Sequence, residues 1–248
     1  MWIVKPKPNP SAQLKLFCLP FAGGGSVSFR PWSDLVPEQI ELIAVEIPGR
    51  GRRIGEPLRR RMDYLIPDMA QGLLPELDKP FALFGHSMGT LLAFELAHFL
   101  KDHQHPKPLH LFLSGRGAPH IPSRDKPIHR LADDEFIREI KNFNGTPKEV
   151  LEHEELMQIV VPILRADFEI CETYQFKPKL PLEIPITVFG GLRDSGASRE
   201  ELAAWEKHTS SEFNLRMFPG DHFFLLEHFR VLIESMVRDL YGHFAVIG

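Results

Sequence analysis

The sequence predicts an α/β fold in which a mostly parallel central sheet is flanked by helices. Short apolar runs of β character alternate along the chain with longer segments of helical period, the order typical of strand–helix–strand units. Several runs are apolar throughout rather than at every second residue, as expected for parallel strands that helices cover on both faces. The 248 residues are 43% hydrophobic and 25% charged, so we expect a single globular domain over 1–248.

The predicted elements follow one another in order along the chain. The expected strands are Leu14–Leu19, Ile40–Ile47, Phe81–Phe84, Leu109–Leu113, Ile186–Phe189 and Leu215–Phe218. The expected helices are Trp32–Val36, Met62–Leu77, Met88–Lys101, Ser198–Thr209 and Leu225–Phe244. Ser198 and Glu201 have the Ser-x-x-Glu spacing of a capping box, which supports a helix start there. Such alternation predicts a parallel sheet with right-handed crossovers.

One segment, about 120–176, breaks this alternation because it contains helical patterns and no clear strand. The patterns cover Asp133–Phe143, Pro147–Glu155 and Leu156–Thr173. So long a helical excursion between two strands of one sheet indicates an insertion, which we interpret as a helical lid.

The stretch "FGHSMG" predicts a nucleophile at Ser87. A strand, then Gly-x-Ser-x-Gly, then a helix is the context of a nucleophile elbow, whose turn is so sharp that the flanking positions must be small. Gly85 and Gly89 meet that need. The pentapeptide alone is common in proteins, and the two flanking elements make it specific. The turn would raise the Ser87 hydroxyl above the sheet, over a helix amino terminus that favours negative charge.

A serine needs a base to take its proton and an acid to orient that base, and in this arrangement the chain order is serine, acid, histidine. The run Ile186–Phe189 is followed by "GGLRDSGAS", which offers Asp194. The run Leu215–Phe218 is followed by "PGDHFFLL", which offers His222. Both lie after strand ends, where open α/β sheets place their sites.

Rival residues stand near each of these positions. Asp221 adjoins the histidine and is expected to shape its turn, and His228 is expected inside the last helix. His86 should point away from the serine, either as a packing residue or as a support behind the catalytic residues. Asp167 in "LRADFE" falls in the lid, where a salt bridge is a better interpretation than catalysis.

Acyl chemistry also needs N–H donors for an oxyanion. One should be the backbone N–H of Met88, the residue after the nucleophile. The other should come from the loop "PFAGGG" after the first long strand, with Ala22 favoured and Phe21 its neighbouring alternative. The loop lacks the Lys-Ser/Thr of a phosphate-binding P-loop and does not complete Gly-x-Gly-x-x-Gly.

The histidines, the net charge, the cysteines and a group of arginines bear on metal, nucleic-acid, membrane and partner binding. His98, His103, His105 and His110 match no metal-site spacing, so neither a metal nor a cofactor is expected. A net charge of −4 gives no argument for nucleic acid, and no run is long enough for a membrane span. Two cysteines and no signal peptide favour the cytoplasm. Six arginines between Arg50 and Arg61 are either a solvated surface or a dock for an acidic partner.

The chain closely resembles the stand-alone type II thioesterases of nonribosomal peptide and polyketide synthases. The resemblance rests on "LFCLPFAGGG", "VEIPGRGRRIGEP", "FGHSMG", "LRADFEICETY" and "PGDHFFL", in the family's order. It implies an α/β-hydrolase fold with a helical lid and a triad of Ser87, Asp194 and His222. It also implies hydrolysis of acyl groups from the phosphopantetheine arm of carrier proteins, which clears stalled or misprimed synthases. Where relatives often carry Asp-Pro or a similar dipeptide, this chain has Asp194-Ser195-Gly196.

Three functions therefore remain open at this point. The first is a serine thioesterase that acts, as a monomer, on an acyl- or peptidyl-carrier protein. The second is a carboxylester hydrolase or acyltransferase with the same residues. The third is a non-catalytic binding module, against which the intact serine, acid and histidine argue.

Overall fold

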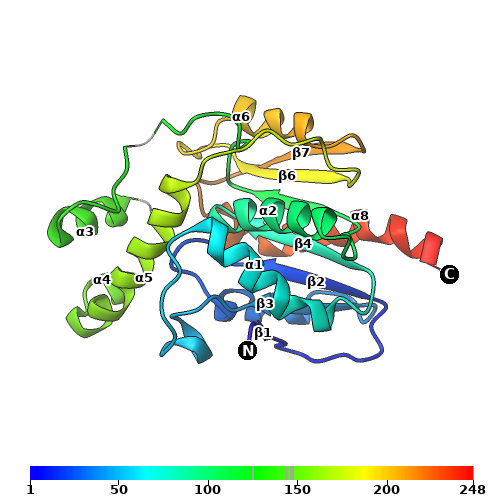
Figure 1. Ribbon diagram of the computed structural model, residues 1–248, viewed down its shortest axis with the longest axis horizontal. Coiled ribbons are helices and arrows are strands. Elements are labelled where there is room, and N and C mark those ends of the chain that lie inside the picture. The colour runs from blue at the N-terminus through cyan, green and yellow to red at the C-terminus, as the bar shows by residue number, and fades with distance from the viewer. Residues whose placement is uncertain (125, 143–144, 146–147, 248) are drawn as a thin grey trace.

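A seven-stranded sheet forms the centre of the molecule, with the order β1-β3-β2-β4-β5-β6-β7 (Figure 1). The computed structural model describes residues 1–124, 126–142, 145 and 148–247. The strands are β1 (Ile3–Val4), β2 (Leu14–Leu19), β3 (Ile40–Val45), β4 (Phe81–His86), β5 (Leu111–Ser114), β6 (Ile186–Gly191) and β7 (Phe213–Phe218). β1 runs antiparallel to β3 and every other neighbouring pair is parallel, which confirms the predicted α/β class.

The strand boundaries differ from the sequence prediction in both directions: β3 ends at Val45 rather than Ile47 and β5 begins at Leu111 rather than Leu109, whereas other strands extend because polar residues or glycines continue the ladder. β4 extends to His86, which pairs with Ser114 of β5, and β6 extends to Gly191, which pairs with Phe218 of β7. Backbone pairing continues there although the apolar pattern has ended. The edge strand β1 was not predicted, because two residues are too few to give a periodic signal.

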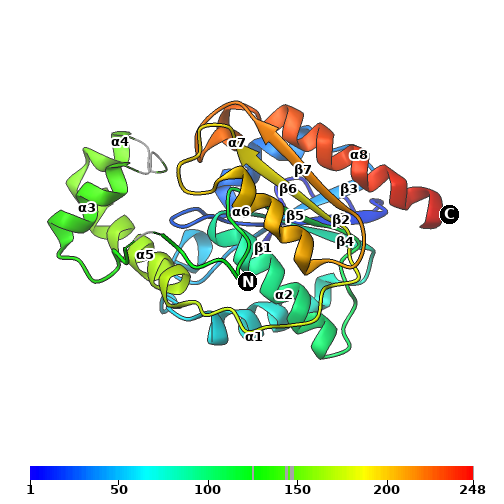
Figure 2. The same cartoon turned by 90° about the horizontal axis from the view of Figure 1, so that it is seen from above.

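Two apolar layers cover the two faces of the sheet, and alternate side chains of β2 pack into each of them. Phe17 and Leu19 face the layer of α1 (Met62–Leu73), α2 (Met88–Asp102) and α6 (Arg199–Ala203). Leu16 and Cys18 face the opposite layer, formed by the 3₁₀ helix Ser26–Asp34, α7 (Phe224–Glu227) and α8 (Phe229–Ile247). Figure 2 shows α8 on one side of the sheet and α1 and α2 on the other. Burial on both faces explains the continuous apolar runs.

Four helix predictions need correction, and one signal is confirmed. The predicted helix at Trp32–Val36 is instead the 3₁₀ helix Ser26–Asp34, which has Pro31 inside it. The 3₁₀ turns Leu74–Glu76 and Ala204–His208 close the segments that begin with α1 and α6. The last predicted helix is broken at His228, whose backbone (φ −111°, ψ 20°) leaves the helical region. The capping box is confirmed: Glu201 N–H donates to Ser198 Oγ, and Ser198 N–H donates to Glu201 Oε2.

The segment 120–176, called the insertion below, lies between β5 and β6. Its helices are α3 (Asp133–Asn142), α4 (Lys148–Leu151) and α5 (Glu154–Thr173), and the predicted ends Phe143 and Pro147 lie outside the described residues. α3 and α4 stand away from the sheet, and α5 lies between them and the sheet (Figures 1 and 2). The insertion has its own apolar cluster, made of Ile128, Phe136, Ile140, Met157, Val161 and Leu164.

Candidate active site

Ser87 lies in the sharp turn between β4 and α2, with φ 54° and ψ −111°. This is a positive φ that a residue with a side chain rarely adopts. A Cβ atom on Gly85 would lie 2.0 Å from the carbonyl oxygen of Gly89, and one on Gly89 would lie 2.4 Å from that of Leu19. The two glycines are therefore required by contact, as the elbow pattern predicted.

Thr90 and Ser114 hold this turn in place from α2 and β5. The N–H of Ser87 donates to the carbonyl oxygen of Ser114 at 2.8 Å. Thr90 Oγ1 lies 2.8 Å from that same oxygen and 3.0 Å from the carbonyl oxygen of Gly85. The strained serine is thus tied to the next strand by a buried polar group. Nothing in the sequence pattern pointed to Thr90 or Ser114.

His222 and Asp194 come together although 28 residues separate them in the chain. His222 Nδ1 lies 2.8 Å from Asp194 Oδ2, and the Asp194 side chain is only 1% exposed against 23% for His222. A buried carboxylate at Nδ1 requires the proton on that nitrogen, which leaves Nε2 as an acceptor. Asp194 Oδ1 accepts from the N–H of Gly196 at 2.9 Å. Gly196 thereby binds the second carboxylate oxygen in the Asp-Ser-Gly turn.

The loops that carry these two residues are joined through their backbones. Leu192 N–H donates to the carbonyl oxygen of Phe218, and Arg193 N–H donates to that of Gly220, each at 2.8 Å. Adjacent parallel strands end at the same edge of the sheet, so the loop after β6 meets the loop after β7 there. The rival Asp221 accepts from the N–H of Phe223 and shapes the turn around His222, as expected.

His86 is fully buried beneath this pair. Its ring lies 5.0 Å from the His222 ring and also packs on Phe21, Phe223 and Phe224. Burial, with His222 as the second cause, lowers the pKa of His86 well below 6.5, so the ring stays neutral. The predicted packing role is therefore correct. Because His86 precedes Ser87, the contact brings the elbow and His222 to the same edge of the sheet.

The loop Phe21–Gly24 is a tight turn closed by a hydrogen bond from Gly24 N–H to the carbonyl oxygen of Phe21, at 2.9 Å. Its third residue, Gly23, has φ +76°, which favours glycine. The N–H of Gly23 donates to Asp167, whereas that of Ala22 forms no hydrogen bond with any described residue. Met88 opens α2, so its N–H has no intrahelical acceptor. A Cβ on Gly89 would reach the carbonyl oxygens of Leu19 and Pro20, so the start of α2 lies against the strand end that leads into this loop.

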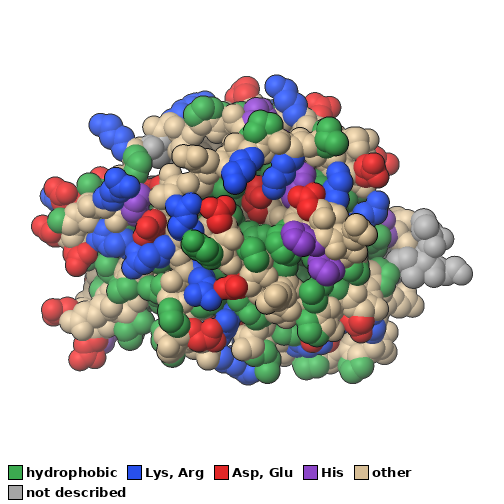
Figure 3. Space-filling view, in the orientation of Figure 1, with side chains coloured by type: hydrophobic (Ala, Val, Ile, Leu, Met, Phe, Trp, Pro, Cys, Tyr) green, Lys and Arg blue, Asp and Glu red, His purple; other side chains and the backbone are tan. Residues whose placement is uncertain are grey.

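Five of the six arginines between Arg50 and Arg61 form ion pairs, whereas Arg52 is exposed and forms none with a described residue. Arg50 and Arg53 are buried, and their partners are Asp167 and Glu56. The pairs nearer the surface are Arg59–Asp68, Arg60–Glu169 and Arg61–Asp63. On the face in Figure 3, blue and red side chains intermingle instead of forming one blue field. Both interpretations of the segment, a solvated surface or a dock, stay predictions, and neither anticipated Asp167 and Glu169, the two partners that are distant in sequence. The salt bridge expected of Asp167 is confirmed.

The histidines considered for a metal site pack on aromatic rings, and His103 also stacks on His105. His98 packs on Phe94, His110 stacks on Phe112, and His103 stacks on Phe99. Within the part of the chain that the structure describes, no group of three or more His, Cys, Asp or Glu could hold a metal ion. Nor does any described helix have the length and apolar character that crossing a membrane requires.

The sequence and the structure are both similar to those of known proteins. A family model described as "Thioesterase domain" matches residues 14–240. The gramicidin S biosynthesis protein GrsT of Aneurinibacillus migulanus is 44% identical over 239 residues, covering 96% of this chain and 93% of that protein. The structure is similar to that of ClbQ from the colibactin NRPS/PKS pathway, with TM-score 0.90, 35% identity, and 96% and 100% of the two chains covered. It is also similar to the type II thioesterase BorB from the borrelidin biosynthetic cluster, with TM-score 0.89, 34% identity, and 96% and 97% covered. The chain therefore belongs to the thioesterase family, among the type II thioesterases of nonribosomal peptide and polyketide pathways.

Proposed function

We propose that this enzyme cleaves acyl thioesters through Ser87, with His222 as base and Asp194 as the acid that orients it. One observation carries the proposal. The hydrogen-bonded pair of His222 and Asp194 lies at the same edge of the sheet as a serine held at positive φ. A serine becomes nucleophilic when an adjacent imidazole can accept its proton.

The reaction follows from these positions. Ser87 Oγ attacks the thioester carbonyl carbon while its proton passes to His222 Nε2, and Asp194 stabilises the imidazolium. Negative charge develops on the carbonyl oxygen, where the N–H groups of Ala22 and Met88 stabilise it. The C–S bond then breaks, and the thiol leaves with the proton from His222. Water, deprotonated by His222, attacks the acyl-serine, releasing the carboxylic acid and restoring Ser87.

The substrate in this proposal is an acyl or peptidyl group on the phosphopantetheine arm of a carrier protein, and its removal frees a stalled or misprimed synthase. Similarity to GrsT and to ClbQ of an NRPS/PKS pathway supports this substrate class. We further propose that the insertion is a lid of a single domain and that the enzyme acts as a monomer. A cytoplasmic location is supported by the two free thiols of Cys18 and Cys171.

The test uses a panel of acyl-carrier proteins, with mass spectrometry of the carrier before and after incubation. The wild-type enzyme should remove acyl groups from the arm, and Ser87→Ala should remove almost none while unfolding at the wild-type temperature. A fluorophosphonate should label the wild-type protein once and leave Ser87→Ala unlabelled. Substantial turnover by Ser87→Ala would show that the nucleophile is another residue. Faster cleavage of matched oxygen esters than of thioesters would instead favour a carboxylester hydrolase.

A further inference from the structure

The insertion helix α5 contacts the loop that carries Ala22 at two points. Asp167 Oδ2 accepts a hydrogen bond from the N–H of Gly23 at 2.8 Å. A Cβ atom on Gly23 would lie 2.5 Å from Leu164 Cδ2, so that side chain occupies the space the glycine leaves. Leu164 and Asp167 are three residues apart and share one face of α5. That face rests directly on the peptide group that follows Ala22.

Arg50 completes this contact from the loop that follows β3. Its guanidinium group forms two hydrogen bonds of 2.7 Å with the two carboxylate oxygens of Asp167. The Nη1 atom also donates to the carbonyl oxygen of Gly24 at 2.9 Å. Asp167 is 0% and Arg50 5% exposed. The pair therefore holds both the N–H of Gly23 and the carbonyl oxygen of Gly24 in a buried, geometrically strict network.

Glu46 anchors the far end of the same loop. Its carboxylate accepts from the Ser26 N–H at 3.2 Å and from the Ser26 hydroxyl at 2.6 Å, and the residue is buried. Glu46 directly follows β3, so the position of Ser26 is fixed by the sheet and not by the insertion. Asp167 stands on α5, so the anchor at Gly23 depends on where the insertion helix lies.

We propose that Asp167 and Arg50 are positioning residues for the oxyanion hole, and that the placement of α5 sets how well the hole stabilises the transition state. This inference rests on the proposed role of Ala22 as an oxyanion donor. Donors must be fixed before the reaction to be effective, and Asp167 and Arg50 fix the residues that follow Ala22. Arg50 also neutralises a carboxylate that would otherwise oppose negative charge near the hole.

The first measurement compares Asp167→Asn with Glu169→Gln on a small acyl thioester. Glu169 lies on the same helix and also joins it to the arginine segment, through Arg60, but its side chain forms no hydrogen bond or ion pair with the loop among the described residues. Asp167→Asn should lower kcat roughly 10- to 100-fold with KM almost unchanged, because substrate binding does not use the oxyanion donors. Glu169→Gln should leave both constants within about two-fold of the wild-type values.

A second readout separates positioning from folding. A boronate that adds to Ser87 forms a charged tetrahedral adduct, and its affinity should fall in Asp167→Asn by the same factor as kcat/KM. The double variant Arg50→Met/Asp167→Leu removes both buried charges, which restores stability in other proteins. It still leaves the Gly23 N–H without its acceptor. We expect this variant to unfold near the wild-type temperature with kcat still low.

Two results would overturn the inference. One is a double variant whose kcat returns together with its stability, because the pair would then be structural only. The other is Asp167→Asn with wild-type kcat and boronate affinity while Ser87→Ala is inactive, which would leave the serine mechanism intact. Retained turnover by Ser87→Ala would instead refute the proposed function itself.

Discussion

Each oxygen of the Asp194 carboxylate has its own donor, Gly196 N–H on Oδ1 and His222 Nδ1 on Oδ2. This asymmetry decides what an amide would do at the same position. In Asp194→Asn, the amide oxygen must serve Gly196, so the NH₂ group faces His222. The imidazole would then accept at Nδ1 and carry its proton on Nε2, which cannot take the serine proton.

Asp194→Asn should therefore lower kcat for a small acyl thioester roughly 10²- to 10⁴-fold while the chain stays folded. Stopped-flow assay and thermal unfolding of the purified variant measure the two quantities, and NMR of the imidazole nitrogens reports the tautomer. If Asp167→Asn proved more damaging than Asp194→Asn, the acid would be assigned to the wrong residue.

Among the helices, α5 contributes Leu164 both to the insertion's own apolar cluster and to the contact with the Ala22 loop. Phe136 and Ile140 of α3 are buried in the insertion's own cluster, so they are not available to line an acyl channel. Val160 packs against that cluster too, but it is only partly buried and stands, on the same face of α5, one turn before Leu164, whose side chain reaches Gly23; Ile159 is 51% exposed.

Val160→Trp should shift the preferred acyl chain toward shorter groups, because added bulk on this face narrows the space above the loop. The measurement is kcat/KM across a series of acyl chain lengths, and Ile159→Trp serves as the matched control with an unchanged profile. Identical profiles for the wild-type enzyme and Val160→Trp would mean that this face of α5 does not line the acyl site.

The sequence could predict those features that depend on residues close together in the chain or on the order of the strands. The elbow at Ser87 and the acid and histidine after late strands follow from periodicity and chain order, and the structure joins Asp194 to His222. The contact between Arg50 and Asp167 spans 117 residues, and no periodic pattern reports a pairing at that distance. The ion pair of Arg60 with Glu169, which lies 109 residues away, could not be predicted for the same reason.

At the scale of the whole molecule, buried histidines make stability depend on pH. Burial lowers the pKa of His98, His110 and His208 from 6.5 to about 4. Between these values the unfolded chain binds more protons than the folded one, so the free energy of unfolding falls as pH falls from 6.5 to about 4. The decrease should level off at lower pH.

Urea unfolding at several pH values measures this slope. His110 accepts or donates one bond to Thr187 and has no partner at Nδ1 among the described residues, so His110→Asn should reduce the slope between pH 6.5 and 4. His103→Asn changes an exposed histidine and should leave it unchanged. An equal slope in the wild type and His110→Asn would contradict this assignment.

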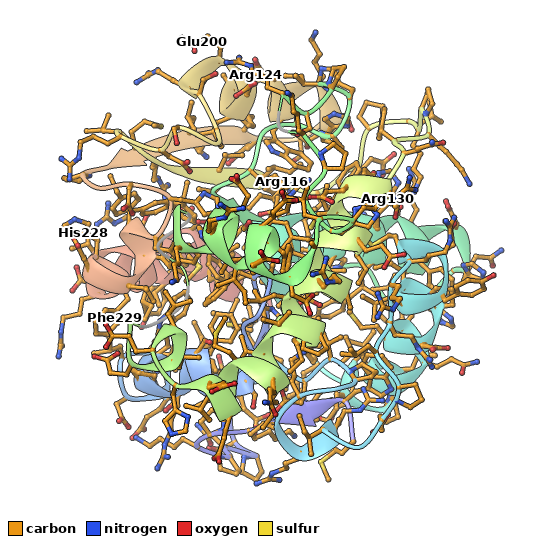
Figure 4. All side chains as sticks on the ribbon, turned by 90° about the vertical axis from the view of Figure 1, so that its left-hand side faces the viewer. Arg116, Arg124, Arg130, Glu200, His228 and Phe229 are labelled. Carbon is orange, nitrogen blue, oxygen red and sulfur yellow. The ribbon has the colours of Figure 1, made fainter. Side chains whose placement is uncertain are left out.

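Electrostatic docking of a carrier protein also belongs to the whole molecule. Figure 4 views the molecule from the insertion side, where Arg116, Arg124 and Arg130 are labelled. Arg59, Arg60 and Arg61 have carboxylate partners and are at most 56% exposed. Arg124 also pairs with a carboxylate, that of Glu201, but its side chain is 74% exposed, and Arg130 forms no ion pair with any described residue, so we expect an acidic carrier surface to meet Arg124 and Arg130.

Reversing Arg124 and Arg130 to glutamate should raise KM for an acyl-carrier protein, most strongly at low salt, and spare a small thioester. Arg59→Glu and Arg61→Glu form the comparison pair. Each new glutamate would lie beside the carboxylate that its arginine formerly paired with. We therefore expect these variants to unfold at a lower temperature, and to change KM equally for the carrier protein and for the small thioester. If the Arg59 and Arg61 variants raised KM for the carrier protein more than the Arg124 and Arg130 variants did, the carrier protein would instead bind at the arginine segment.

The insertion leaves the sheet after β5 and returns at β6, and these two strands are direct neighbours in register, Leu111 beside Ile186. Its two ends are thus set by one strand pairing, so the segment can be exchanged for another of different length without disturbing the order of the sheet. The chain before it supplies Ser87 and the Ala22 loop, and the chain after it supplies Asp194 and His222. In chimeric enzymes built at these junctions, we expect a foreign insertion to transfer activity only if it places a carboxylate where Asp167 meets Arg50 and Gly23.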